Sequence, residues 1–307
     1  MDSLPTILCV GTLTLDMVLS TPRLPSEDER VEAKEAALVG GGNAANAAVA
    51  MARLGLPVEF CGTVGDDRAG MLILDDLASE GVGTSLVERR TGVATAQSAV
   101  VISGSTGART IVTHPAPPPP PIPTGFDIVH LDKAGWKAMP ASGIPGSRIS
   151  VDDGNIIADL DVSLLEWYMP TAIVLRQRYV THDAVEGARR ARAAGATTVV
   201  ATSGFIGSFA LNDENLFFAP ALSIRPRSTL GAGDVFHGAF VAAMALELPL
   251  AAAIRFANIT AALSCRGLDG RSGIPGRREV ETTMDQLESA DLSFAEIVHR
   301  FSDSDGN

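Results

Sequence analysis

Cysteine and histidine are scarce in this sequence, and neither forms a recognisable cluster. Its 307 residues include three cysteines, Cys9, Cys61 and Cys265, which lie far apart in apolar segments without metal-ligand spacing. They are predicted to be buried free thiols in a reducing compartment. The five histidines are scattered, so a histidine metal site is not expected either.

Positive charge and long apolar runs are also lacking. The formal net charge is −12, whereas a nucleic-acid-binding protein needs a basic stripe; Arg189 and Arg190 are typical of a solvated helix face. No apolar run reaches bilayer-spanning length, and residues 1–5 lack the basic start and apolar stretch of a signal peptide. We therefore expect a cytoplasmic protein with no nucleic-acid or membrane partner.

A glycine-rich turn followed by an apolar helix is the most informative stretch of the chain. Gly231 and Gly233 flank Ala232, and Asp234 begins a segment whose apolar residues recur at helical spacing. Such a turn leaves backbone N–H groups bare at a helix N-terminus, where the dipole favours an anion. An aspartate there is explained if the anion is a phosphoryl group in transit and Asp234 takes the proton of the attacking hydroxyl. Taken alone, the pattern also fits an ordinary glycine-rich loop capped by an aspartate, and no Walker Gly-Lys-Ser/Thr follows it.

A second glycine cluster occurs near the N-terminus. Gly41, Gly42, Asn43 and Asn46 belong to a Gly-Gly-Gly-Asn-Ala-Ala-Asn segment that opens a helix ending at Gly55. The two asparagines are three residues apart, so both should project from nearly one helix face and could hold sugar hydroxyls. Tight helix–sheet packing or a degraded dinucleotide loop remain alternatives, because the Gly-x-Gly-x-x-Gly spacing is absent.

Alternating strands and helices fill most of the chain. Strands are predicted at residues 6–10, 58–64, 127–131, 148–151, 172–175 and 197–201, and helices at 70–80, 183–194 and 250–265. Polar groups follow several strands, at the edge where α/β proteins bind ligands: Asp16, the pair Asp152 and Asp153, and the segment 202–207. A turn-capping role for Asp16 and a hairpin turn at 202–207 are the alternatives.

A β-hairpin at residues 92–113 interrupts the alternation. Together with residues 12–38 it suggests a small discontinuous sheet that acts as a lid over a ligand cleft. The predicted division is a core of residues 1–11, 39–90 and 115–307 and a lid of 12–38 and 91–114. Arg109 lies on the returning strand and, by itself, indicates only a solvated edge charge. The proline-rich segment 115–123 is interpreted as a stiff spacer, and the last ~35 residues as an acidic helical region with a frayed tail at 302–307.

Read together, the two glycine segments carry a family resemblance. GGGNAANAAVAMARLG at 40–55 and STLGAGDVFHGAF at 228–240 resemble the two signatures of the ribokinase family, also called the phosphofructokinase-B (pfkB) family of carbohydrate kinases. The resemblance implies a three-layer α/β fold whose mostly parallel sheet is flanked by helices, with a β lid that often serves as a homodimer interface. It also implies magnesium- and ATP-dependent phosphorylation of a small sugar.

The resemblance further implies roles for individual residues. Asp234 matches the catalytic base, and the backbone of Gly231, Ala232 and Gly233 matches the anion hole for the γ-phosphate. The sugar-binding positions correspond to Asp16, Gly41, Gly42, Asn43 and Asn46. The nucleotide loop corresponds to Thr202, Gly204 and Gly207, and the adenine wall to Asn258 and Ala261. Arg109 matches a lid arginine near the transferring phosphate in ketohexokinase-like members.

Three departures from the family pattern bear on substrate and metal. Gly135 stands where sulfofructose kinases, which the chain otherwise resembles along with ketohexokinases, carry an arginine; a ketose or sugar acid is therefore expected rather than sulfofructose. Ser228 replaces the usual Asp near the monovalent-cation loop, so potassium activation is not implied. Residues 176–179 appear where the family has Asn-x-x-Glu, and we therefore expect Asp152 or Asp153 to support magnesium through water.

Other functions stay open at this point. A nucleoside kinase of the same fold is one, although an aromatic content of 5% leaves few rings to stack a second base. A sugar-binding regulator that has lost catalysis is another, suggested by residues 176–179. A nicotinamide dehydrogenase is a third, against which the missing dinucleotide fingerprint argues.

Overall fold

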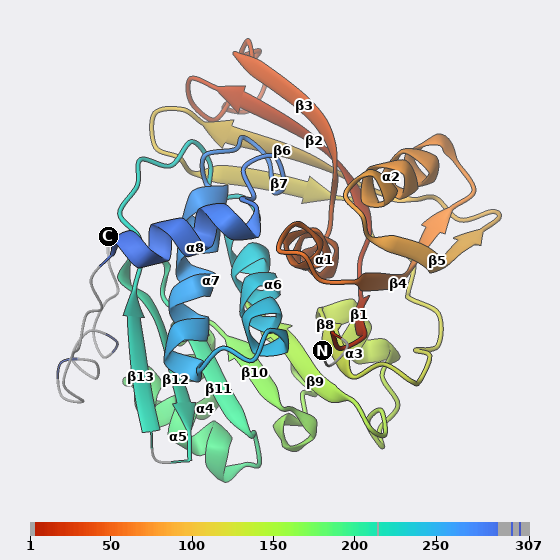
Figure 1. Cartoon of the computed structure of the whole chain (residues 1–307). Coiled ribbons are helices and arrows are strands. Elements are labelled where there is room, and N and C mark those ends of the chain that lie inside the picture. Colours follow the sequence, from red (N-terminus) through yellow and green to blue (C-terminus); the bar gives the residue numbers. More distant parts are fainter. Residues whose placement is uncertain (1–3, 214, 288–295, 297–300, 302–307) are drawn as a thin grey trace.

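The computed structural model describes residues 4–213, 215–287, 296 and 301. Within these residues, the largest element of the fold is a nine-stranded sheet (Figure 1). All neighbouring strands are parallel except at one edge, where the last two strands run antiparallel. In spatial order the strands are β13 (Asn215–Pro220), β12 (Gly207–Asn212), β11 (Thr198–Thr202), β10 (Trp167–Pro170), β9 (Arg148–Asp153), β8 (Ile128–Leu131), β1 (Ile7–Val10), β4 (Val58–Gly65) and β5 (Gly83–Arg90).

Helices cover both faces of this sheet, and the strand sequences show why. All four residues of β1 are buried, as expected of a parallel strand between two helical layers. Ile7 and Cys9 point into one core and Leu8 and Val10 into the other, following the two-residue period of a strand. The first core includes α1 (Asn43–Arg53), α2 (Arg68–Ser79), α6 (Ala232–Ala245), α7 (Leu250–Ser264) and α8 (Arg277–Gln286). The second includes α3 (Lys133–Ala138), α4 (Ala172–Tyr179) and α5 (Ala184–Ala193).

A separate four-stranded sheet lies beyond α1 and α2 (Figure 1). Its order is β3 (Glu35–Gly41), β2 (Thr14–Thr21), β6 (Ala96–Ser103) and β7 (Arg109–Thr113), with β6 and β7 forming the predicted hairpin. The inner face packs Val18, Val100 and Ile102 against Leu268 and Leu230. Because Leu230 directly precedes Gly231, this sheet rests on the loop that opens α6. The predicted fold class, a mostly parallel sheet between helices with a small additional sheet, is confirmed.

Two local predictions are wrong. Residues 172–175 form helix rather than strand, because the Thr171 hydroxyl accepts the Val174 N–H and caps α4; the strand is β10, five residues earlier. Asp16 lies within β2 of the small sheet, not in a turn after the first strand. The segment 202–207 leads into the antiparallel strand β12, which is the hairpin alternative.

The remaining expectations concern cysteines, membranes and the C-terminal region. Cys9, Cys61 and Cys265 are buried and free, as predicted. No helix of the described part of the chain is long and apolar enough to cross a membrane. Helix α8 falls in the predicted C-terminal helical region, whereas the frayed tail predicted at 302–307 lies outside the described residues.

Candidate active site

The N-terminus of α6 is an open turn of backbone amides. Gly231 adopts a left-handed conformation, with φ of 74°, and a Cβ there would lie 2.8 Å from the Gly270 Cα. Within the described residues no side chain caps this end of the helix. A Cβ on Gly233 would meet nothing within 4 Å. The Ala232 N–H donates to the Thr229 carbonyl oxygen at 3.3 Å, while the space beside Gly233 is open next to the positive end of the helix dipole.

Asp234 lies in the first turn of α6 and is half-buried. Its Oδ2 accepts a hydrogen bond of 2.8 Å from the Asn46 amide at the start of α1. Burial, followed by the negative charge of Asp152, raises the pKa of Asp234 to about 7, against the lowering effect of the Asn46 hydrogen bond. A carboxyl with a pKa near neutrality is suited to accept a proton from an alcohol during reaction.

Asp152, at the end of β9, forms a second carboxylate centre close to the first. Its Oδ2 accepts from the Asn43 amide at 3.1 Å, and its Oδ1 lies 3.4 Å from Nδ1 of His237, one turn after Asp234 on α6. Burial opposes ionisation of Asp152, but His237 and the amide hydrogen bonds outweigh it, so its pKa lies below the usual range. The two asparagines of the first glycine segment thus each hold one carboxylate of the site.

The neighbouring glycines make room for Asp16. A Cβ on Gly41 would lie 2.1 Å from the Asp16 Oδ2, and one on Gly42 would lie 2.1 Å from the Thr12 carbonyl oxygen. Among the described residues nothing donates a hydrogen bond to the buried Oδ1 of Asp16. A buried acceptor of this kind is suited to a ligand hydroxyl.

Arg109 connects the small sheet to this centre. It begins β7, and its Nη1 donates to the Thr229 hydroxyl at 3.0 Å, two residues before Gly231. The structure therefore places this sequence-predicted residue beside the amide turn of α6.

The predicted nucleotide residues form a separate group at the β11–β13 edge. Thr202 ends β11, Gly204 opens a 3₁₀ turn (Gly204–Ile206) and Gly207 begins β12. The Asn258 amide on α7 donates to the carbonyl of Ala219 at 2.7 Å, which joins that helix to the hairpin; Ala261 lies one turn further along α7. No hydrogen bond among the described residues links this group to Asp234.

Asp153 has internal partners instead of an open position. Its Oδ1 accepts the Ile157 N–H at 2.7 Å, and its Oδ2 accepts from Tyr168 at 2.8 Å and from Arg178 at 2.7 Å. The side chain is fully buried and both of its oxygens already accept hydrogen bonds, so Asp153 is poorly placed to bind magnesium. Residues 176–179, the expected position of the family's Asn-x-x-Glu segment, occupy the second half of α4. The residues that directly follow strand β10 are 171–174. Their sequence, Thr-Ala-Ile-Val, also lacks a carboxylate.

Packing explains two of the departures from the family pattern. A Cβ on Gly135 would lie 2.2 Å from the Val10 carbonyl oxygen, so α3 could not pack on β1 with an arginine there. Ser228 is buried, and its hydroxyl accepts the Leu230 N–H at 3.1 Å, which makes it a local cap of the turn before α6.

Sequence reasoning missed three residues of this centre: His237, Asp132 and Arg271. Asp132 follows β8 and accepts from the amides of Thr12, Ala134 and Gly135, a position after a strand that could have been recognised. Arg271 donates to Asn46 across 225 residues of sequence, and no local pattern signals such a contact. In the described part of the chain, no group of three or more His, Cys, Asp or Glu side chains could hold a metal.

Comparisons with known proteins agree with this architecture. A model of the pfkB family of carbohydrate kinases matches residues 4–119 and 174–276. The ribokinase of Bacillus subtilis is 27% identical over 288 residues, covering 90% of this chain and 98% of that protein. The ketohexokinase of Mus musculus is 24% identical over 293 residues, covering 87% and 98%.

Solved structures share the fold. Ribokinase from Thermotoga maritima superposes with a TM-score of 0.76 at 21% identity, covering 92% of this chain and all of the other. Arabidopsis thaliana ribokinase, solved with ribose and ATP, gives a TM-score of 0.72 at 23% identity, covering 92% and 98%. Because the family model matches well over half of its length, the chain belongs to the pfkB family of carbohydrate kinases.

Proposed function

We propose that this chain transfers the γ-phosphate of ATP to a hydroxyl of a small carbohydrate, a ketose or a related sugar acid. The observation that carries the proposal is the position of Asp234, a carboxyl with a pKa raised to about 7, in the first turn of a helix whose amide turn is open. An acceptor for a proton and donors for an anion lie within one turn of backbone. Phosphoryl transfer to an alcohol requires that combination.

The reaction follows from these positions. The sugar hydroxyl oxygen forms a bond to the γ-phosphorus while its proton passes to Asp234, and the bond from that phosphorus to the β–γ bridging oxygen breaks, releasing ADP. The amides of Gly231–Gly233 stabilise the charge on the transferred group.

The sugar would be held by Asp16, Gly41, Gly42, Asn43 and Asn46, and Arg109 would approach the phosphates from the small sheet. Thr202, Gly204, Gly207, Asn258 and Ala261 would bind the nucleotide. Relatives solved with ATP and ADP support the use of ATP as the phosphate donor.

Magnesium is expected to arrive with ATP, held mostly by phosphate and water oxygens. Asp152 is the carboxylate that fits it, since it lies next to the last residue of β9, at the ligand-binding edge of the sheet, and is held ionised by its neighbours. When bound, the ion would neutralise phosphate charge.

An Asp152→Asn substitution should therefore raise the magnesium concentration needed for half-maximal activity by roughly 10-fold or more, as loss of a supporting ligand does. Titrating magnesium at fixed ATP measures this. Asp66→Asn, which changes an exposed carboxylate paired with Arg89, serves as the control. Equal magnesium dependence in Asp152→Asn and the parent chain would exclude Asp152 from this role.

The outer face of the small sheet supports homodimer formation. Leu38, Met17, Ala99 and Val112 are paired in register from β3 through β2 and β6 to β7, and form one exposed row, called here the outer row. The exposed fractions are 51% for Leu38, 42% for Met17 and 69% for Val112. A contiguous exposed apolar row of this kind is typical of a protein interface. With its inner face on the α6 loop, the sheet would act both as a lid and as a dimer surface.

A coupled ADP-release assay over ketoses, aldoses, sugar acids and nucleosides tests the proposed activity. ADP release that depends on a ketose or sugar acid is expected. Release with nucleosides alone would make the chain a nucleoside kinase. Sugar binding without ADP release in any mixture would indicate a regulator and overturn the proposal.

A further inference from the structure

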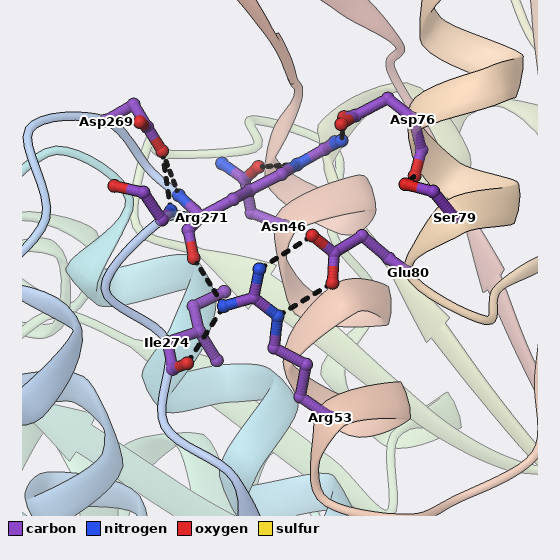
Figure 2. A network of polar contacts seen from close by, with 9 residues as sticks. Asn46, Arg53, Asp76, Ser79, Glu80, Asp269, Arg271 and Ile274 are labelled. Atoms are coloured by element: carbon purple, nitrogen blue, oxygen red, sulfur yellow. Dashed lines mark hydrogen bonds and ion pairs between the residues drawn. The ribbon is translucent and has the colours of Figure 1, made fainter.

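A buried arginine reaches the site from the loop between α7 and α8. Arg271 is 3% exposed, and its guanidinium contacts three elements. Its Nε donates to the Asn46 Oδ1 at 2.9 Å, its Nη1 pairs with Asp76 of α2, and its Nη2 lies 3.4 Å from the Gly41 carbonyl oxygen. Figure 2 shows the side chain extended between Asn46 and Asp76.

The Asn46 amide lies between this guanidinium and the Asp234 carboxylate. Its oxygen faces Arg271 and its nitrogen faces Asp234. A guanidinium can only donate hydrogen bonds and an ionised carboxylate can only accept them. The reverse amide orientation would therefore place its NH₂ group against the Arg271 donors and its oxygen against the Asp234 oxygens. We propose that Arg271 is a positioning residue that locks the Asn46 amide with its NH₂ group toward Asp234 throughout the reaction.

A fixed orientation of the Asn46 amide matters because Asp234 changes protonation state during the proposed reaction. An ionised Asp234 would by itself select the observed amide orientation. Once protonated, its O–H could instead donate to the amide oxygen, and an unrestrained Asn46 would turn to accept it. Arg271 occupies that oxygen in both states. The amide therefore always favours the ionised carboxylate, which is the form that can take the next proton.

The position of the guanidinium is itself fixed by a network that does not touch Asp234. Asp269 Oδ1 accepts the backbone N–H groups of Arg271 and Ser272. Arg53 of α1 donates to the Arg271 carbonyl oxygen at 2.8 Å and forms a two-bond ion pair with Glu80, the residue after α2 (Figure 2).

Glycines on either side leave the space for this contact. A Cβ on Gly40 would lie 2.3 Å from the Arg271 Nη1, and one on Gly270 would lie 3.0 Å from the Asn46 nitrogen. Both segments that approach the Arg271–Asn46 contact therefore lack side chains at the points of closest approach.

Other charged groups also act on Asp234, and the experiment must separate them. Asp152 from β9 and Asp132 after β8 disfavour its ionised form, while His237 on α6 favours it. None of these groups forms a hydrogen bond with Asn46 in the described part of the chain. Removing the positive charge of Arg271 would also disfavour ionisation of Asp234 through space. Both this effect and a freed Asn46 amide would raise the pKa of Asp234.

The test compares Arg271→Met in two backgrounds, and its kinetic arm rests on the proposed kinase activity. In the parent chain the substitution should move the acidic midpoint of the kcat/KM profile upward by about one pH unit, the scale of a hydrogen bond to a charged group. Activity below that midpoint then falls about 10-fold. Titration of the Asp234 carboxyl by ¹³C NMR, without substrate, should show the same displacement.

The same substitution in an Asn46→Ala background should give little further displacement, because the group through which Arg271 acts is gone. Arg266→Met is the matched control: it removes a partly exposed arginine of the same loop, paired with Glu279, and should leave both midpoints unchanged.

Each result has a defined meaning. An unchanged midpoint in Arg271→Met, or an equal displacement with and without Asn46, would overturn the proposal; the second result would show that the guanidinium acts by charge alone. A parent chain that releases no ADP with any acceptor would refute the kinase assignment. The NMR comparison would still test the role of Arg271.

Discussion

At the residue scale, Asp234 combines reactivity with a cost in stability. Its pKa is raised to about 7 by burial and by Asp152, so ionising it is less favourable in the folded chain than in the unfolded one. The sign follows from linkage: a carboxyl whose folded-state pKa exceeds the unfolded value of about 3.9 destabilises the fold as the pH rises through that interval. The folded state therefore carries this penalty in full above about pH 7.

Asp234→Asn should separate the two effects. We expect kcat to fall roughly 10²–10⁴-fold, the usual contribution of a general base, with little loss of sugar binding. At pH 8 the variant should be more stable by about 1–3 kcal/mol, a range reduced from the full shift because the side chain is partly exposed. At pH 4 the two proteins should have similar Tm values.

Calorimetry at both pH values, with turnover and sugar binding measured alongside, checks this prediction. A variant with near-normal turnover would exclude Asp234 as the base. A stability gain that does not depend on pH would show that its source is not the buried charge.

At the element scale, the site depends on how closely α1 and α6 approach. A Cβ on Gly238 of α6 would lie 2.4 Å from the Ala47 carbonyl oxygen of α1. The contact lies one turn after Asp234 on α6 and one residue after Asn46 on α1, and it brings Asn46 within hydrogen-bonding distance of Asp234. The two glycines of α6, Gly233 and Gly238, therefore have different reasons to be glycine, since one faces open space and the other a helix.

Alanine at each of these two positions distinguishes function from packing. Gly233→Ala should keep or slightly raise the Tm, because alanine favours helix by up to about 1 kcal/mol over glycine and nothing obstructs its Cβ. It should nevertheless lower kcat/KM at least 10-fold, the scale for a disturbed anion hole.

Gly238→Ala is the opposite case and should cost about 1–3 kcal/mol of stability through overpacking. Thermal melts and steady-state kinetics on both variants give the comparison. Unimpaired catalysis in Gly233→Ala would place the transferred phosphate elsewhere.

Local patterns predicted these elements well where the signal was itself local. The β1 strand, the helix after Asn43 and the β6–β7 hairpin followed from apolar periodicity and glycine turns. Residues 172–175 were mistaken for a strand because a β-branched run outweighed the capping signal of Thr171. The contacts of Arg271 and His237 with the site depend on tertiary packing, which no single stretch of sequence encodes.

At the scale of the whole molecule, the small sheet carries apolar side chains on both of its faces. Its inner side packs against Leu230 and Leu268 beside the α6 loop, and its outer row is apolar and exposed. Closing the site and pairing two subunits would thus involve the same four strands. Assembly and turnover are expected to depend on each other.

Leu38→Glu, at the β3 end of the outer row, should convert a homodimer to a monomer, because pairing would bury two uncompensated charges. Light scattering after size-exclusion chromatography measures the mass. Ile173→Glu on α4, which replaces a side chain 56% exposed, is the control and should leave the mass unchanged. A parent chain that is already monomeric, or a dimeric Leu38→Glu variant, would contradict the proposed interface.

The bond between Asn46 and Asp234 spans 188 positions of sequence, and this has a consequence during biosynthesis. A nascent chain that has been synthesised as far as β13 already contains the first glycine segment and all nine strands of the central sheet. It lacks Asp234, the turn at Gly231–Gly233 and Arg271. Under the proposed mechanism, phosphoryl transfer would therefore require that synthesis has passed Arg271.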